Sequence, residues 1–238
     1  MKKDAKHFEG TDVKKHLLRA RQKGACASGE MHGTESSGFL SAFCDSGREL
    51  AVILLFLSLL PSSSSTLFII SIPLILWKTG RSAQLGYFRL ERLHRLIEEE
   101  RYEILHHRAQ EKEELLEMYR AKGLSGSLLE ETVEVLMADD NRLLKVMLEE
   151  ELGLTLESFE HPLRQGFGAF LGSSLSCLVL LIAARFHALL PLSLTLSACF
   201  TFLLAKKNQN NLIRQVSWTL SLALIGYFTL TFLIEILQ

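Results

Sequence analysis

The sequence lacks the patterns that most often identify an enzyme or a disulfide-rich protein. Its four cysteines, Cys26, Cys44, Cys177 and Cys199, include no Cys-x-x-Cys pair, so neither a disulfide framework nor a zinc knuckle is predicted. The chain has no recognisable set of nucleophile and base, no phosphate-binding loop and no cofactor motif. We therefore predict that the protein is not an enzyme and that it holds no cofactor.

The N-terminal segment lacks an apolar stretch. Residues 1–37 are polar and basic, and no apolar run follows the first lysines within the distance that a cleavable signal peptide requires. A basic arm of this kind suits nucleic acid or anionic lipid, or it acts as a cytosolic tail that sets membrane topology. We favour the topological role and predict no nucleic-acid partner.

The charge is nearly balanced, with a formal net charge of −1, but its distribution is uneven. Apolar residues concentrate in residues 50–77 and 166–237, and the charged residues lie before and between these regions. Runs of about 18 or more apolar residues with few charges are typical of membrane helices. We therefore predict an all-α polytopic membrane protein with lipid as a partner.

The first apolar region is compatible with one span or with two. A single helix over residues 50–77 would place the cations near Lys78 and Lys206 on the side opposite to the basic N-terminus. A hairpin that turns at residues 61–65 (Pro-Ser-Ser-Ser-Ser) keeps these cations on the N-terminal side. The positive-inside rule therefore favours the hairpin.

Three later spans, at about residues 166–186, 189–205 and 212–237, bring the predicted total to about five. The N-terminus and the region between spans two and three are then cytosolic, and the C-terminus lies outside. The membrane is predicted to be a bacterial inner membrane or an organellar membrane. The predicted parts are a basic cytosolic tail (1–37), a transmembrane hairpin (38–80), an acidic cytosolic helical domain (81–160) and the last three spans (161–238).

The segment between spans two and three holds most of the acidic residues of the chain. Its apolar residues recur at three- and four-residue spacing, which predicts three amphipathic helices. The second span is expected to run into the first of these helices with little interruption. Gly123 and Gly153 are predicted to end helices, and Asp139 or Asp140 offers a cap for the third one.

One face of this acidic segment is rich in carboxylates if the first helix is continuous. Glu103 and Glu114 are eleven residues apart, which is about three helical turns. Glu100, His107 and Glu117 lie near them on the same face. Oxygen-rich clusters with an occasional nitrogen suit Mn²⁺ or Fe²⁺. A solvated acidic face, neutralised by nearby cations, is the other interpretation of this pattern.

Three charged residues, Asp45, Arg48 and Glu49, lie at the start of the first apolar region. Charges at membrane depth are costly and are candidates for a functional role. The strongly apolar run begins only at Leu50, so these residues could instead lie at the cytosolic edge. Both interpretations stay open on the sequence.

Two segments resemble the cytosolic domain of the vacuolar iron transporter family. They are residues 111–125 (Glu-Lys-Glu-Glu-Leu-Leu-Glu-Met-Tyr-Arg-Ala-Lys-Gly-Leu-Ser) and residues 147–154 (Met-Leu-Glu-Glu-Glu-Leu-Gly-Leu). The order of two spans, acidic helices and three spans is similar to that family as well. The resemblance extends over about residues 93–190.

The resemblance implies a homodimeric carrier that moves Fe²⁺, and often Mn²⁺, out of the cytosol in exchange for protons. It also implies that glutamates of the cytosolic helices collect the metal and that a first-span aspartate lines the path. The candidate metal ligands are Glu100, Glu103, Glu114, Glu117, Met147, Glu150 and Glu151, and the candidate pathway residue is Asp45.

The chain departs from the family pattern in its first two spans. The Asn-Asp-Gly stretch of the family is matched only approximately by residues 44–47 (Cys-Asp-Ser-Gly), and Gly-Glu-Tyr is replaced by residues 80–82 (Gly-Arg-Ser). An arginine at a cation entrance raises the electrostatic barrier unless an acid pairs with it. The alternative hypothesis is therefore a non-transporting membrane-anchored metal sensor, or a scaffold that binds a partner through its acidic helices.

Overall fold

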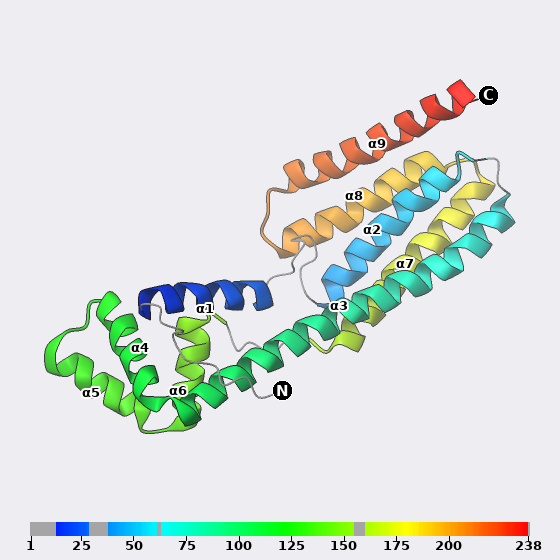
Figure 1. The fold of residues 1–238 in the computed structure, drawn as a ribbon. Coiled ribbons are helices and arrows are strands. Elements are labelled where there is room, and N and C mark those ends of the chain that lie inside the picture. The colour runs from blue at the N-terminus through cyan, green and yellow to red at the C-terminus, as the bar shows by residue number, and fades with distance from the viewer. Residues whose placement is uncertain (1–12, 29–37, 61–62, 155–159, 238) are drawn as a thin grey trace. The chain divides into compact units, whose positions relative to one another are not determined.

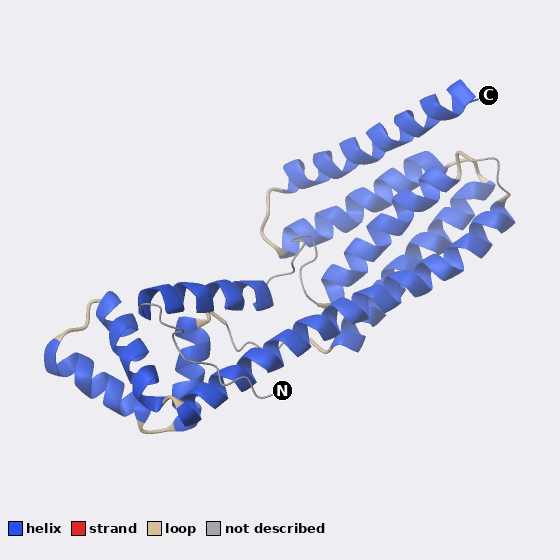
Figure 2. Ribbon diagram, in the orientation of Figure 1, coloured by secondary structure: helices blue, strands red, loops and turns tan. Residues whose placement is uncertain are grey.

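A computed structural model describes residues 13–28, 38–60, 63–154 and 160–237, without the side chains of residues 21–28. Every regular element in these ranges is a helix, and no strand occurs among them (Figure 2). The predicted all-α class is therefore confirmed for the described residues. The elements are α1 (Val13–Ser28), α2 (Phe39–Leu57), α3 (Ser64–His106), α4 (Arg108–Ala121), α5 (Gly126–Met137), α6 (Asp140–Val146), a π-helix (Met147–Glu151), α7 (Pro162–Arg185), α8 (Leu189–Lys207) and α9 (Leu212–Leu237).

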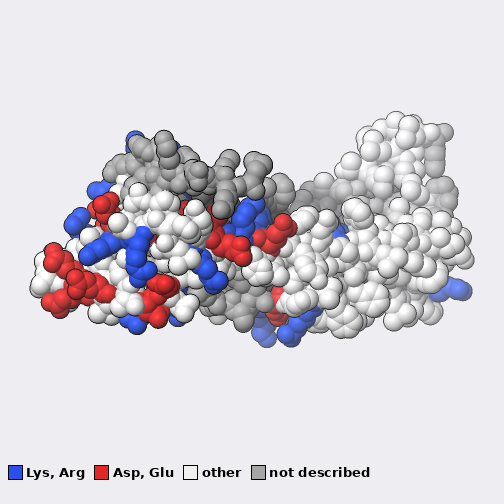
Figure 3. All heavy atoms as spheres, turned by 60° about the horizontal axis from the view of Figure 1, so that its bottom comes forward, with Lys and Arg blue, Asp and Glu red and all other residues white. Residues whose placement is uncertain are grey.

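The helices form two compact units (Figure 1). The acidic unit comprises residues 1–34 and 88–158, and the apolar unit comprises residues 35–87 and 159–238. Helix α3 begins in the apolar unit and ends in the acidic one. Charged side chains gather over the acidic unit, whereas the visible surface of the apolar unit is largely uncharged (Figure 3).

Helix α3 is a single helix of 43 residues with Pro73 inside it. The expected continuation of the second apolar segment into the acidic region is therefore confirmed. The helix ends at His106, because His107 leaves helical geometry with φ −126° and ψ 31°. The carbonyl of His107 accepts from the N–H groups of Gln110 and Glu111 and thereby starts α4. The assumption of one continuous helix through Glu114 is wrong for this reason.

The other predicted helix ends in the acidic unit are confirmed. The side chain of Asp139 accepts from the backbone N–H of Arg142 at 2.8 Å and caps α6. Gly123, with φ 96°, follows α4, and Gly153, with φ 66°, follows the π-helix. Glycine adopts this left-handed conformation without the steric cost that other residues meet.

Two apolar clusters hold the acidic unit together, and α1 contributes to both. Ala20 of α1 is buried in the first cluster, and Leu17 packs against the second. The described N-terminal residues are thus packed against the acidic helices. The buried members of the first cluster are Ala20, Leu93, Leu96, Leu148, Leu152 and Leu154, and those of the second are Ile104, Leu115, Met118, Leu129, Val133, Leu143 and Met147.

Three helices in the described part of the chain, α7, α8 and α9, are long and apolar enough to cross a membrane. They correspond to the three later spans predicted from the sequence. Helix α7 begins four residues earlier than predicted, because Pro162 suits the first helical turn and the His161 side chain accepts from the N–H of Leu163. Many of their apolar side chains are exposed, as lipid-facing residues are.

Helix α2 packs closely against α7 (Figure 1). A Cβ atom on Gly172 would lie 1.9 Å from the carbonyl oxygen of Phe43, and one on Gly168 would lie 2.3 Å from that of Phe39. One turn further along, the Ser176 hydroxyl donates to the carbonyl of Gly47 at 2.7 Å. Small residues four apart therefore let the two backbones touch, as in many membrane helix pairs.

We expect Gly172→Val to prevent the correct packing of the apolar unit, because the added carbons would overlap the α2 backbone. The expected cost is about 3 kcal/mol, the upper end of the usual range for overpacking, since a backbone cannot yield as a side chain does. Thermal unfolding and size-exclusion profiles of the full-length protein in detergent measure the effect. Gly80→Ala is the control, because a Cβ there meets nothing within 4 Å. Equal melting temperatures for Gly172→Val and the wild type would contradict this packing.

Candidate metal centre

Four buried carboxyl groups converge in the acidic unit. They belong to Glu100 of α3, Glu111 and Glu114 of α4, and Glu151 of the π-helix, and each residue is at most 4% exposed. Glu103 of α3 is half-buried and adds its negative charge to the same group. Three elements that are separate in the chain thus deliver carboxyl groups to one place.

The local sequence explains how these side chains come to face one another. Glu100 and Glu103 are three residues apart, as are Glu111 and Glu114, so each pair lies on one side of its helix. The interruption at His107 separates the two pairs onto different helices. Glu151 is the last residue of a π-helical turn, in which the N–H of Leu152 donates to the carbonyl of Met147. Such turns occur frequently at functional sites.

Burial and mutual repulsion raise the pKa of Glu100, Glu111 and Glu114 and favour their protonated form. Burial is the largest cause that raises the pKa of Glu100 to about 10, and the charges of Glu151 and Glu111 add to it. Burial likewise raises the pKa of Glu111 and of Glu114 to about 9. A carboxyl group in apolar surroundings disfavours its charged form, and neighbouring carboxylates disfavour it further.

Two of the buried carboxyl oxygens have no hydrogen-bond partner among the described residues. They are Oε1 of Glu100 and Oε2 of Glu151. Burial of a polar atom without a partner costs free energy. A cation in the cluster would coordinate such oxygens and offset that cost.

Helix α1 places an imidazole beside the cluster. Nε2 of His16 lies 3.5 Å from Oε1 of Glu151 and 3.7 Å from Oε1 of Glu114. One ligand atom from each of the three residues lies within 4.8 Å of the other two. The hydrogen bond to Glu151 is the largest cause that raises the pKa of His16 above its usual value. The sequence pattern predicted an imidazole from His107 on this face, but His107 is the residue that interrupts α3.

The structure brings together some of the predicted ligands and places others apart. Glu100, Glu103, Glu114 and Glu151 lie in or at the cluster. Met147 is fully buried in the second apolar cluster, with Ile104 and Leu115 among its members.

The two remaining predicted ligands line a groove of about 690 Å³ between α1, α4 and the π-helix. Glu117 forms ion pairs with Lys14 at 3.3 Å and Arg120 at 3.2 Å. Glu150 pairs with Lys122. Both carboxylates are therefore engaged by cations at a partly open surface.

Two residues of this centre, Glu111 and His16, were not predicted from the sequence. The signal for Glu111 was present, because the spacing Glu-x-x-Glu occurs both at residues 100–103 and at residues 111–114. His16 had no local signal, because only the packing of α1 brings it to the cluster.

The candidate pathway residue lies in the apolar unit. Asp45 of α2 is 2% exposed and accepts a hydrogen bond from Nη2 of Arg48 at 2.8 Å. Glu49 of α2 pairs with Lys78 of α3. The charges at the start of α2 are thus arranged as ion pairs, which lowers the cost of placing them in an apolar environment.

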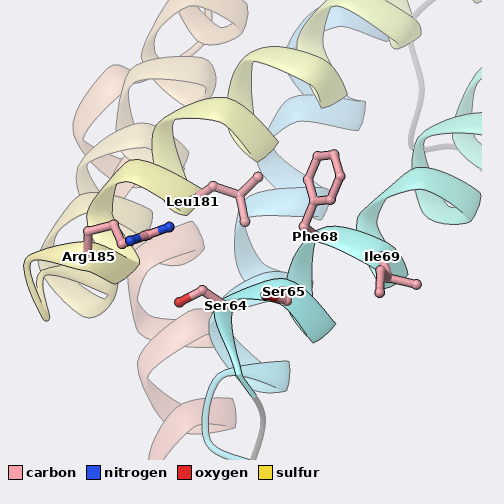
Figure 4. Close-up of a pocket in the computed structure, with 6 residues that line it drawn as sticks. All are labelled: Ser64, Ser65, Phe68, Ile69, Leu181 and Arg185. Carbon is pink, nitrogen blue, oxygen red and sulfur yellow. The ribbon is translucent and has the colours of Figure 1, made fainter.

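The apolar unit also has a pocket of about 350 Å³ between the start of α3 and the end of α7 (Figure 4). The guanidinium of Arg185 lines it, and a fixed positive charge disfavours a divalent cation. This pocket is therefore a poorer metal site than the carboxyl cluster. Its lining residues are Ser64, Ser65, Phe68, Ile69, Leu181 and Arg185.

The sequence profile of the VIT family matches residues 89–232, which is more than half of the chain. The chain belongs to the VIT family. The resemblance inferred from the acidic segment is thereby confirmed. No curated protein sequence matches the chain significantly. Membership of the VIT family and the three apolar helices identify a membrane protein of a metal-transporter family, which agrees with the predicted absence of an enzymatic role.

Proposed function

We propose that this VIT-family protein exports Fe²⁺ or Mn²⁺ from the cytosol in exchange for protons, and that the carboxyl cluster collects the metal. The observation that carries the proposal is the convergence of four buried carboxyl groups from three elements. Buried like charges destabilise a fold unless a cation or protons neutralise them. A divalent cation with oxygen ligands is the group that this arrangement suits best.

Proton exchange is supported by the protonated state of the cluster. The raised pKa values of Glu100, Glu111 and Glu114 leave these groups protonated at neutral pH. A metal ion binds the deprotonated carboxylate, so it must displace these protons. Each metal ion that enters the cluster therefore releases protons.

We also propose the five-span topology, with α2 and the first part of α3 as the first two spans. The acidic unit and the N-terminus are then cytosolic, and the C-terminus lies outside. The cations at Lys78, Arg81, Lys206 and Lys207 support this orientation through the positive-inside rule. We further propose a homodimer, in an organellar membrane or a bacterial inner membrane.

A second candidate function is a metal sensor or scaffold that does not transport. The observation in its favour is the pairing of acids with cations at the start of α2, where Asp45 meets Arg48 and Glu49 meets Lys78. Arg81 adds a cation where related sequences are expected to carry an acid. A path lined by such pairs presents fewer free carboxylates to a moving metal ion.

Flux measurements on the full-length protein in proteoliposomes distinguish the two functions. We expect uptake of Fe²⁺ and Mn²⁺ to increase when the lumen of the liposomes is more acidic than the outside. Protons that leave the lumen would then drive metal into it by exchange. Metal binding is measured on the same preparation. Binding without flux, from protein that is folded and correctly inserted, would support the sensor or scaffold and contradict the transporter.

A further inference from the structure

We propose that His16 of α1 is a direct ligand of the metal in the carboxyl cluster and that it biases the site toward Fe²⁺ over Mn²⁺. This inference rests on the proposed function, because it takes the cluster as the metal site. The addition to the proposed function is a nitrogen ligand from the N-terminal helix. Residue 16 precedes the segment that the VIT profile matches, which begins at residue 89.

The distances around His16 suit coordination of one ion. Ligand atoms about 2.1 Å from a metal, at angles between octahedral and tetrahedral, lie roughly 3.0–3.5 Å apart. Nε2 of His16 is 3.5 Å from Oε1 of Glu151 and 3.7 Å from Oε1 of Glu114. Small side-chain rotations would therefore place all three atoms at bonding distance from a single ion.

The hydrogen bonding of the carboxylates independently indicates a missing cation. Oε2 of Glu151 and Oε1 of Glu100 are buried and accept no hydrogen bond from any residue in the described ranges. Both residues are at least nine-tenths buried, and both belong to the group of carboxyls that His16 contacts. The imidazole alone does not satisfy these oxygens, whereas a metal ion bound beside it would.

Packing holds His16 in place. Leu17, the next residue, packs against the second apolar cluster, and Ala20, one turn further, is buried in the first. On the other side, Lys14 forms an ion pair with Glu117 of α4 at 3.3 Å. Three contacts within two helical turns thus fix the face of α1 that carries the imidazole, and a ligand held in this way loses little entropy on binding.

A nitrogen ligand changes which metal the site prefers. Carboxylates alone suit Mn²⁺, Mg²⁺ and Ca²⁺, whereas imidazole suits Zn²⁺, Cu²⁺, Fe²⁺ and Ni²⁺. Co²⁺ follows Fe²⁺ in the affinity order of divalent metals and replaces it in the test below. With His16, the cluster becomes a mixed oxygen and nitrogen site. Selectivity between the two proposed cargo metals therefore depends on α1.

A different role for His16 makes the opposite prediction. If the imidazolium only neutralises Glu114 and Glu151, it competes with a metal ion, and its removal should raise metal affinity. If His16 is a ligand, its removal should lower affinity, and more for metals that prefer nitrogen. The sign of the change therefore separates the two roles.

The test uses Co²⁺ and Mn²⁺ with the full-length protein in detergent, compared among the wild type, His16→Ala, His16→Gln and the control His94→Ala. His94 is an exposed histidine of α3 in the same unit. We expect His16→Ala and His16→Gln to weaken Co²⁺ binding by at least about tenfold and Mn²⁺ binding less, and His94→Ala to change neither. Electron spin-echo spectra of bound Mn²⁺ should show the nitrogen coupling of a coordinated imidazole in the wild type and in His94→Ala, and not in the His16 variants.

Each outcome decides the proposal. Unchanged or tighter Co²⁺ binding by a folded His16 variant would overturn it and leave the carboxyl site intact. If neither variant folds, the absence of nitrogen coupling in the wild type would overturn it without a variant. A wild type that binds neither metal would overturn this inference and the metal-collecting role of the cluster together.

Discussion

Replacing Glu111 and Glu114 together with glutamine is expected to abolish metal binding by the full-length protein and to make the metal-free protein more stable at alkaline pH. Both residues are fully buried among other carboxyl groups. Glutamine keeps the size of glutamate but cannot ionise, so it removes both the anionic metal ligands and the repulsion between carboxylates. With two ligands lost, the Kd for Mn²⁺ should rise at least about a hundredfold.

The pH dependence of this effect follows from the raised pKa values. Glu100, Glu111 and Glu114 have a higher pKa in the folded protein than in the unfolded chain. Their contribution to stability is therefore complete below about pH 4.5 and decreases as pH rises toward 9 to 10. The decrease is at most about 1.4 kcal/mol per pH unit for each carboxyl that stays protonated only when folded. The wild type should thus melt at a lower temperature at pH 8.5 than at pH 6, and the double variant should show a smaller difference.

Melting curves with and without saturating Mn²⁺ complete this experiment. We expect Mn²⁺ to bind the folded wild type but not the unfolded chain or the double variant. It should therefore raise the melting temperature of the wild type at pH 8.5 and leave that of the double variant unchanged. The matched control is Glu130→Gln with Glu134→Gln, which removes two exposed carboxylates of α5. If Glu117→Gln with Glu150→Gln lowered the Mn²⁺ affinity equally, the buried cluster would not be the sole metal site. The groove residues Glu117 and Glu150 would then be ligands, as the sequence predicted.

Asp45→Asn is expected to reduce metal flux to the level of empty liposomes while metal binding by the acidic unit is retained. Asp45 is buried, and its helix α2 packs against α7 and α8. An amide carries neither a negative charge nor an exchangeable acidic proton, so it can neither attract the metal ion nor carry the counter-proton. The matched control is Glu235→Gln, which neutralises an exposed carboxylate near the end of α9.

A second variant separates transport from simple charge pairing. Asp45→Asn removes the carboxylate that accepts from Arg48 at 2.8 Å, and the remaining cation alone could block a metal ion. Asp45→Asn with Arg48→Gln removes both charges. If Asp45 carries metal or protons, the double variant stays inactive. Restored flux in the double variant would assign Asp45 to charge pairing only and remove it from the transport pathway.

Most of the helical framework could be predicted from the sequence, because it depends on local patterns. Apolar runs of sufficient length located α7, α8 and α9, and Asp139 marked the start of α6. The continuation of α3 into the acidic region also followed from its uninterrupted periodicity. These features are set by residues that are near one another in the chain.

The composition of the metal centre depends on contacts between distant residues, and it was predicted only in part. The helix is interrupted at His107, which is neither glycine nor proline, so the periodicity of the apolar residues did not predict the break. The break places Glu111 and Glu114 on α4, apart from Glu100 and Glu103 on α3, and the carboxyl groups of the two helices converge. His16 lies 84 residues before Glu100, which is the first of the buried cluster glutamates in the sequence. Only the packing of Leu17 and Ala20 brings His16 to the cluster.

The close crossing of α2 and α7 limits how the apolar unit moves. Side chains normally separate two packed helices and allow small shifts between them. At Gly168 and Gly172 no side chain lies between the two backbones. Any displacement that brings a residue with a larger side chain to the carbonyl group of Phe39 or Phe43 would cause a steric clash, so we expect the pair to keep its register. Transport cycles commonly proceed by rocking of rigid groups of helices. If the protein transports as proposed, we expect α2 and α7 to move as one body. A residue on α2 such as Asp45 would then change its access to either side of the membrane only when other helices move past that pair.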